Sequence, residues 1–310
     1  MRIVLRTAYT SGVGVVVLAA LAVAGCGAAS GPATHGKVSV VAAFYPVAYA
    51  AQRVGGARAV VTNLTPAGAE PHDLELSPKQ VDEIQSANVV LVMGNGFQPA
   101  VERSAHQRDG ETVVLLQQLP IGAKGKQVKE GDPNALDPHV WLAPRLMVDI
   151  VDDVARALAK ADPKEKATFT RNARAFDSQL RALDMRYSQG LAHCRRTLIV
   201  TSHEAFGYLA KAYGLHQQGV SGLSPDAEPD AKRLAELSDL AKKQHVTTIF
   251  TETLVSPKIA ETLAREAGGL RTDVLDPLEG LTGKEAAAGD DYLTVMNRNL
   301  EKLRGALDCR

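Results

Sequence analysis

Three histidines and one aspartate occur where predicted strands or turns give way to loops. They are His72, His139, His203 and Asp276. Zn²⁺ is bound by four tetrahedral ligands drawn from Cys, His and Asp or Glu, and when protein side chains fill all four positions none is left for a catalytic water. These residues therefore predict a site that captures one zinc ion and does no chemistry on a substrate.

Three of these candidate ligands lie next to a proline. His72 and His139 directly follow one, and Asp276 directly precedes one. Proline fixes its own φ and restricts the residue before it, so these loops lose less conformational entropy when they hold a metal-binding side chain in place. Glu70 and Glu204 adjoin ligands, and either carboxylate could orient an imidazole from outside the ligand shell. Solvated roles for both glutamates are equally compatible with the sequence.

The elements that must position these residues alternate between strand and helix. Runs rich in Val and Ile predict strands at residues 38–43, 59–62, 88–93, 112–116, 197–202, 218–221, 247–251 and 272–275. Helical patterns lie between or after them at 46–54, 78–87, 204–213, 230–244, 257–267 and 290–307. This alternation predicts an α/β fold with two parallel-sheet domains. Ligands bind beyond the carboxyl ends of such strands, so we expect the metal in the interdomain cleft.

A long helix is predicted between the two halves. After a first helix at residues 144–160, apolar residues recur at spacings of 4, 3, 4, 3 and 4, at Phe169, Ala173, Phe176, Leu180, Leu183 and Tyr187. A helix of about 26 residues spans roughly 40 Å at 1.5 Å per residue. We expect a rigid linking helix at 163–190, between an N-terminal metal-binding lobe at 38–162 and a C-terminal metal-binding lobe at 191–310.

Residues 1–25 have the pattern of a signal peptide. Arg2 and Arg6 precede an apolar run of about 12 residues, whereas a helix that crosses a bilayer needs about 20. The run ends in small residues before Cys26, which resembles a bacterial lipoprotein signal in which that cysteine carries the lipid. Ordinary cleavage nearby is the alternative. With 26–37 as a lipidated flexible tether, we expect an exported protein anchored on the outer face of the cytoplasmic membrane.

Two further cysteines, Cys194 and Cys309, remain in the exported chain. In an oxidising compartment two widely separated thiols are more often bridged than free, so we predict a disulfide that pins the last helix; two buried thiols are the alternative. The chain has 35 basic and 35 acidic residues. No concentrated basic face is evident, so nucleic acid is not an expected partner.

Five stretches resemble the solute-binding proteins of ABC-type zinc and manganese importers. They are residues 70–78, 137–142, 201–210, 222–229 and 274–278. The resemblance implies two α/β lobes bridged by a long helix, and it implies the same four ligands. It further implies a receptor, not an enzyme, that delivers its ion to a membrane ABC permease. We expect the receptor to be a monomer.

The third ligand bears on the identity of the metal. In this resemblance manganese members tend to carry glutamate there and zinc members histidine, and imidazole suits Zn²⁺ better than Mn²⁺. His203 therefore predicts zinc, with a manganese receptor or adhesin as the alternative. A secreted zinc hydrolase using Glu204 or Glu70 as base is less favoured, because Gly207 stands where His-Glu-x-x-His needs its second histidine. Many zinc members have a histidine-rich loop before the second ligand, but residues 122–137 contain no histidine.

Overall fold

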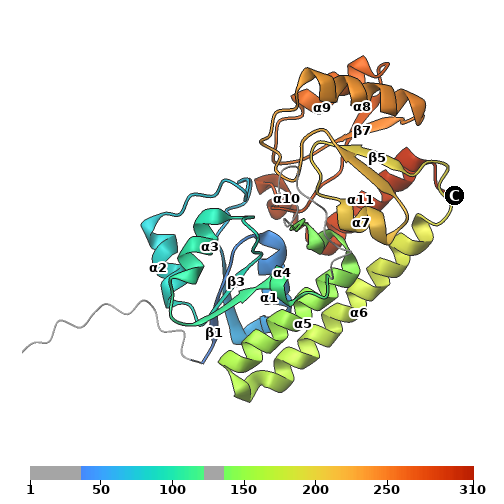
Figure 1. Ribbon diagram of the computed structural model, residues 1–310. Helices are drawn as coiled ribbons and strands as arrows, with labels where there is room; N and C mark the ends of the chain where they lie inside the picture. The colour runs from blue at the N-terminus through green and yellow to red at the C-terminus, as the bar shows by residue number, and fades with distance from the viewer. Residues whose placement is uncertain (1–35, 122–135) are drawn as a thin grey trace, which may run out of the picture. The chain divides into compact units, whose positions relative to one another are not determined.

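The computed structural model describes residues 36–121 and 136–310. The predicted signal peptide, Cys26 and nearly all of the tether lie outside the described residues. Within them, two four-stranded parallel sheets are flanked by helices, as the sequence predicted (Figure 1). In the same described ranges, no helix is both long enough and apolar enough to cross a membrane.

The first sheet has the strand order β2-β1-β3-β4. Its strands are β1 (Val38–Ala42), β2 (Ala59–Asn63), β3 (Val89–Val92) and β4 (Glu111–Val114). Its helices are α1 (Tyr45–Gly55), α2 (Pro78–Ser86), α3 (Pro99–His106) and the single turn α4 (Leu115–Gln118). Ser77 and Gln80 form a capping box at the start of α2, with Pro78 in its first turn. Helices α1 and α2 were predicted from the sequence, but α3 and α4 were not.

The second sheet repeats this layout with the order β6-β5-β7-β8. Its strands are β5 (Leu198–Thr201), β6 (His216–Gly219), β7 (Thr248–Thr251) and β8 (Arg271–Val274). Its helices are α7 (Gly207–Ala212), α8 (Ala231–Lys243), α9 (Lys258–Glu266), α10 (Gly283–Ala288) and α11 (Tyr292–Leu307). Strand β6 begins two residues earlier than predicted, and α7 begins later because residues 202–206 form the turn that carries His203.

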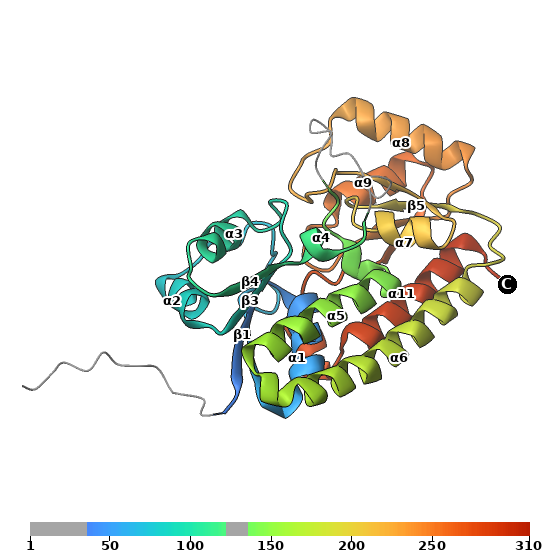
Figure 2. The ribbon, with the colours of Figure 1, turned by 60° about the horizontal axis from the view of Figure 1, so that its bottom comes forward.

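Two long helices connect the sheets. Helix α5 (Pro144–Ala161) is followed by a 3₁₀ turn at Pro163–Glu165 and then by α6 (Lys166–Gly190). All six residues of the predicted apolar stripe on α6 are buried. Helix α6 packs against α1, α5 and α11 (Figure 2). A continuous helix packed along its length has few ways to bend, as expected for the linking element.

A covalent link holds the chain just beyond the last residue of the C-terminal helix α11. A disulfide joins Cys194 to Cys309, which confirms the predicted bridge.

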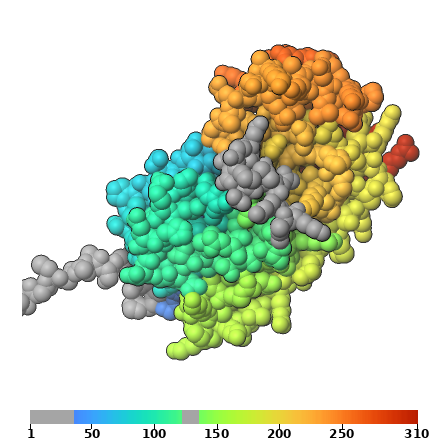
Figure 3. Space-filling view, in the orientation of Figure 1, coloured from blue at the N-terminus to red at the C-terminus, as the bar shows by residue number. Residues whose placement is uncertain are grey.

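The largest buried core runs from Val38 to Leu307, and a smaller one lies under the second sheet. In the space-filling view (Figure 3), residues of the first half of the chain (blue to green) and the α8–α9 region (orange) occupy different parts of the visible face. The lobe boundaries at 162 and 190 therefore stay predictions, since side chains from both halves share one interior.

Candidate metal centre

Four side chains gather their polar atoms at one point. His72, His139, His203 and Glu279 each offer one ligand atom, and these atoms all lie within 4.8 Å of one another. His72 precedes α2, His139 precedes the 3₁₀ turn Val140–Leu142, His203 follows β5, and Glu279 lies between β8 and α10. The site is thus built from loops of both sheets, as predicted. The last three side chains are buried and His72 is partly buried.

The spacing of these atoms fits a small tetrahedral cation. Oε1 of Glu279 lies 3.1 Å from Nε2 of His139, 3.2 Å from Nε2 of His203 and 3.4 Å from Nε2 of His72. The Nε2 atoms of His139 and His203 are 3.3 Å apart. In a tetrahedral zinc site with bonds of about 2.0–2.1 Å, neighbouring ligand atoms are about 3.3–3.4 Å apart. Four of the six distances among these atoms therefore match the spacing of ligands in a tetrahedral Zn²⁺ site.

Two buried carboxylates orient the imidazoles. Oδ1 of Asp137 accepts a hydrogen bond from the backbone N–H of His139 and lies 2.7 Å from its Nδ1. Oε1 of Glu252 accepts from the backbone N–H of His203, and its Oε2 lies 2.6 Å from Nδ1 of that ring. A carboxylate that accepts the Nδ1 proton fixes the tautomer and leaves the Nε2 lone pair for a metal. Both rings are therefore held with Nε2 facing Glu279.

Two other carboxylates, Glu70 and Glu204, were predicted from the sequence for this role. Oε1 of Glu70 accepts from the backbone N–H of His72 at 3.0 Å, so it holds the loop of that ligand. Glu204 lies 3.9 Å from Arg233 and lines a cavity of about 730 Å³ beside α8. The prediction missed Asp137 and Glu252. Glu252 directly follows β7, so the rule that ligand sites form at the carboxyl ends of strands could have found it.

The structure differs from the sequence prediction at the fourth ligand. Asp276 is 3% exposed, but it is not a member of the group that surrounds the common point. Its Oδ1 accepts from the backbone N–H of Leu278 at 2.7 Å, and its Oδ2 has no hydrogen-bond partner among the described residues. After Pro277 the chain turns at Leu278, whose φ is 56°, and this turn brings Glu279 to the histidines instead. Burial raises the pKa of Asp276 to about 7.

The buried charges of the group depend on one another. Burial alone lowers the pKa of His203, but Glu252 and Glu279 outweigh it and raise that pKa well above its ordinary value. Burial raises the pKa of Glu279, but His203, His139 and His72 outweigh it and hold that pKa well below the usual range. Burial and the charge of Glu279 raise the pKa of Glu70 to about 8. The anionic group at the centre is therefore Glu279, which supplies the one negative charge that faces a bound cation.

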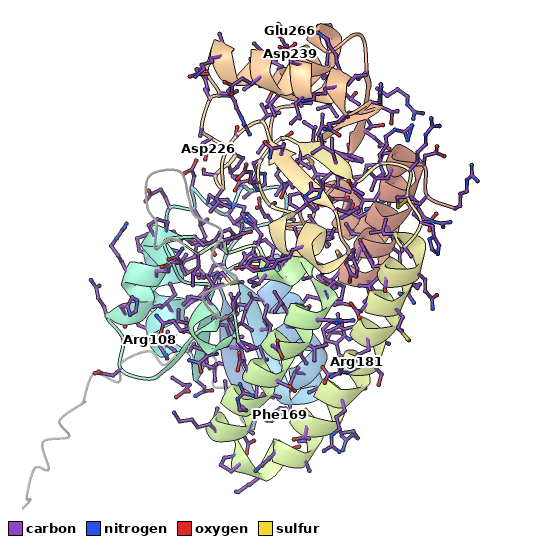
Figure 4. The ribbon with its side chains drawn as sticks, turned by 45° about the vertical axis from the view of Figure 1, so that its right-hand side comes forward. Arg108, Phe169, Arg181, Asp226, Asp239 and Glu266 are labelled. Atoms are coloured by element: carbon purple, nitrogen blue, oxygen red, sulfur yellow. A yellow bond between two sulfur atoms is a disulfide. The ribbon has the colours of Figure 1, made fainter. Side chains whose placement is uncertain are left out.

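An acidic cavity adjoins the loop of His72. It has a volume of about 390 Å³ and is lined in part by the acidic residues Asp73, Asp226 and Glu228, together with Glu70, whose raised pKa leaves it largely protonated near neutral pH. Asp226, labelled in Figure 4, comes from one of the five stretches noted in the sequence, residues 222–229. A concave surface lined by one sign of charge concentrates ions of the opposite sign. The surroundings of the group thus favour cations.

Comparisons with known proteins find relatives that are named for zinc binding or zinc uptake. A model of the family described as zinc-uptake complex component A, periplasmic (ZnuA), matches residues 40–306. The chain is 39% identical over 283 residues to the zinc-binding lipoprotein AdcA of Streptococcus pneumoniae, covering 88% of this chain and 56% of that protein. It is 34% identical over 318 residues to the high-affinity zinc uptake system protein ZnuA of Bacillus subtilis, covering 96% and 97%.

A solved structure shows the same architecture. The Zn(II)-bound ZnuA-like domain of Streptococcus pneumoniae AdcA superposes with a TM-score of 0.73 at 38% identity, covering 88% of this chain and 100% of that domain. The chain spans 56–57% of the length of the AdcA relatives that it matches. The likeness therefore concerns one domain of those longer proteins.

Proposed function

The chain belongs to the ZnuA family, whose members are solute-binding receptors, and from this premise we propose that it is an extracytoplasmic receptor for zinc. It binds one Zn²⁺ with high affinity through His72, His139, His203 and Glu279, and it delivers the ion to an ABC-type importer in the membrane. The observation that carries this proposal is the convergence of three imidazole nitrogens and one carboxylate oxygen, with Glu279 at 3.1–3.4 Å from the nitrogens.

The donor set favours zinc over manganese. Imidazole nitrogen suits Zn²⁺, whereas Mn²⁺ prefers carboxylate, carbonyl and water oxygens. Three of the four proposed donors are nitrogens, and two of the rings are held by carboxylates that increase their basicity. A manganese receptor would need more oxygen donors at the centre than this group offers.

The same donor set argues for binding rather than catalysis. Four protein ligands complete a tetrahedral shell, whereas a catalytic zinc keeps one position for water. The proposed bases of a hydrolase are engaged elsewhere, since Glu70 accepts from the backbone of His72 and Glu204 lies beside Arg233. We therefore propose that the chain is not an enzyme.

Attachment to the membrane is a further part of the proposal. The small residues before Cys26 support cleavage there and a lipid on that cysteine, with the folded part on the outer face of the cytoplasmic membrane. The relative from Streptococcus pneumoniae is named a lipoprotein. Because all four proposed ligands come from one chain, zinc binding needs no second copy, and we propose a monomer.

Metal competition tests the proposal. The exported chain is stripped with a chelator and reloaded in an equimolar mixture of Zn²⁺ and Mn²⁺, and the retained metals are measured by elemental analysis. We expect one zinc per chain and no manganese. His203→Ala should lose the zinc, whereas His216→Ala, at an exposed histidine on β6, should keep it. Retention of manganese, or chelator-sensitive hydrolysis of an ester or peptide by the wild type, would refute the proposal.

A further inference from the structure

Three buried side chains connect the loop of His139 to the loop of Glu279. The indole Nε1–H of Trp141 donates to the carbonyl oxygen of Pro277 at 2.8 Å. The hydroxyl of Tyr292, at the start of α11, donates to the carbonyl oxygen of Trp141 at 2.5 Å. Asn299, also on α11, accepts from the backbone N–H of Asp276 at 3.1 Å and donates to its carbonyl oxygen at 2.7 Å. We call Trp141, Tyr292 and Asn299 the inter-loop clamp.

The clamp is buried and closely packed. The exposed fractions of Trp141, Tyr292 and Asn299 are 0%, 0% and 1%. The Trp141 ring lies 4.8 Å from the ring of Phe44 and 5.2 Å from that of His139, centroid to centroid. The indole therefore has no room to turn, and breaking any of its bonds leaves a buried polar group without a partner.

The loop that the clamp holds has an unfavourable backbone conformation. Leu278 has a φ of 56°, in the left-handed region that bulky residues rarely adopt. Such a residue persists there only when its surroundings hold it. Asp276 and Pro277, the two residues held by Asn299 and Trp141, come directly before Leu278. A relaxation of Leu278 to negative φ would redirect the next residue, which is Glu279.

We propose that the inter-loop clamp positions the Glu279 carboxylate against the histidines before the metal arrives, and that it thereby sets the affinity for zinc. The proposal rests on the proposed function and adds positioning residues to it. Trp141 and Asn299 act through Glu279 and do not touch the ion. Helix α11 is the platform, because Tyr292 and Asn299 lie on it and contact the two loops.

One substitution removes a single donor of the clamp and nothing else. Trp141 is the only tryptophan of the chain. Production in a tryptophan auxotroph supplied with benzothienylalanine replaces this indole N–H by sulfur while keeping the ring size. Zinc affinity is measured by competition with a chromophoric chelator. We expect it to fall about tenfold, the lower end of the loss seen when a partner of a metal ligand is removed.

A matched pair of tyrosines separates positioning from general stability. Tyr292→Phe removes a buried hydroxyl that donates to the clamp. Tyr187→Phe removes one that donates to the carbonyl oxygen of Met296, also on α11, at 2.7 Å and with no ligand loop involved. Both changes should lower the melting temperature similarly. Only Tyr292→Phe should weaken zinc binding, and this comparison does not depend on how the analogue-containing protein folds.

The route through Glu279 is tested in a double-mutant cycle. In a Glu279→Ala background no carboxylate remains to be positioned, so the tryptophan analogue should cause no further loss of affinity. If the tryptophan analogue changes the zinc affinity of the otherwise wild-type protein by less than twofold, the proposal of the clamp is overturned and the proposed function is not. An equal loss in both backgrounds would also overturn the proposal of the clamp. A wild type that binds no zinc at all would overturn the proposed function, and the clamp with it.

Discussion

Replacing Glu279 by Gln should weaken zinc binding at least 100-fold, whereas Asp276→Asn should change it by less than threefold. The two residues are three positions apart in one loop, and both are buried. Oε1 of Glu279 faces three imidazole nitrogens at 3.1–3.4 Å, while Oδ1 of Asp276 is engaged with the backbone of its own turn. The comparison therefore tests which carboxylate binds the ion.

The magnitude follows from the charge that is removed. Glu279→Gln leaves Zn²⁺ with three neutral nitrogens and a neutral amide. Loss of a group that only orients a ligand weakens metal binding about 10–100-fold, and loss of the one charged ligand should cost at least the upper value. A factor of 100 corresponds to about 2.8 kcal/mol. Asp276→Asn preserves the shape of its side chain, and an amide oxygen can still accept from Leu278.

Competition with a chromophoric chelator at constant pH gives both affinities, and a melting curve of each metal-free variant checks its folding. Glu279→Asp is a useful third variant, because it keeps the charge but withdraws the oxygen by about 1.5 Å, one carbon–carbon bond. It should lie between the wild type and Glu279→Gln. A large loss at Asp276→Asn together with an unchanged Glu279→Gln would show that Asp276 is the ligand and that the geometry of this loop is wrong.

Four further predictions concern the metal site and helix α6. His203→Glu exchanges a nitrogen for an oxygen donor and should narrow the preference for zinc over manganese, mainly through weaker zinc binding; an unaltered affinity ratio in competitive titrations would remove His203 from the ligand set. Zinc should stabilise the folded chain by about 2.7 kcal/mol when its free concentration is 100 times Kd. Calorimetry should therefore show a lower melting temperature after chelation. Equal melting temperatures with and without zinc would argue against a site formed by folding. Phe176→Ala should lower the free energy of unfolding in urea by about 3–5 kcal/mol, because this fully buried ring lies in the apolar stripe of α6. Met185→Ala, on the same helix and 57% exposed, should lower it by less than about 0.5 kcal/mol. Similar losses for the two variants would contradict the packing of α6. Burial and the nearby acidic residues raise the pKa of Asp177 from 3.8 to about 6, so the cost to folding grows between these two pH values and is complete above about 6. Asp177→Asn should therefore stabilise the protein at pH 8 by at most about 1 kcal/mol after solvent screening, with no gain at pH 4. Asp239→Asn on α8 serves as an exposed control, and a gain that persists at pH 4 would exclude this cause.

Much of the fold could be predicted because its signals are local. Strands appear as short runs rich in Val and Ile, and the stripe from Phe169 to Tyr187 repeats at helical spacing over five turns. The disulfide could be predicted because two cysteines remain after Cys26. Helix α3 was missed since it has only eight residues and Val101 is its one large apolar side chain. Helix α10 was missed although Thr282 and Glu285 form a capping box at its start, a signal that is visible in the sequence.

The histidines of the site could be predicted for a similar reason. Each follows a strand or a proline-containing turn, so its place at the edge of a sheet depends on nearby residues. The carboxylates that hold the imidazole rings were harder to predict from the sequence. Asp137 lies two residues before His139, within reach of a local interpretation, but Glu252 is 49 residues from His203 and meets it only because β5 and β7 are neighbours in the sheet. The order of strands in a sheet cannot be inferred from any one segment of the sequence.

Among the four proposed ligands, the fourth depends most on the tertiary structure. Asp276 is the first acidic residue after β8, and a sequence pattern alone favours it. Glu279 reaches the histidines because the chain turns at Leu278, which has a positive φ. A glycine would have indicated a positive φ in the sequence, but this position is a leucine. That turn is held by Trp141, which is 136 residues away from Pro277, and by Asn299, 23 residues after Asp276. Which of two acids meets the metal is therefore decided by contacts remote in sequence, so variants of those remote residues should change zinc affinity even though they never touch the ion.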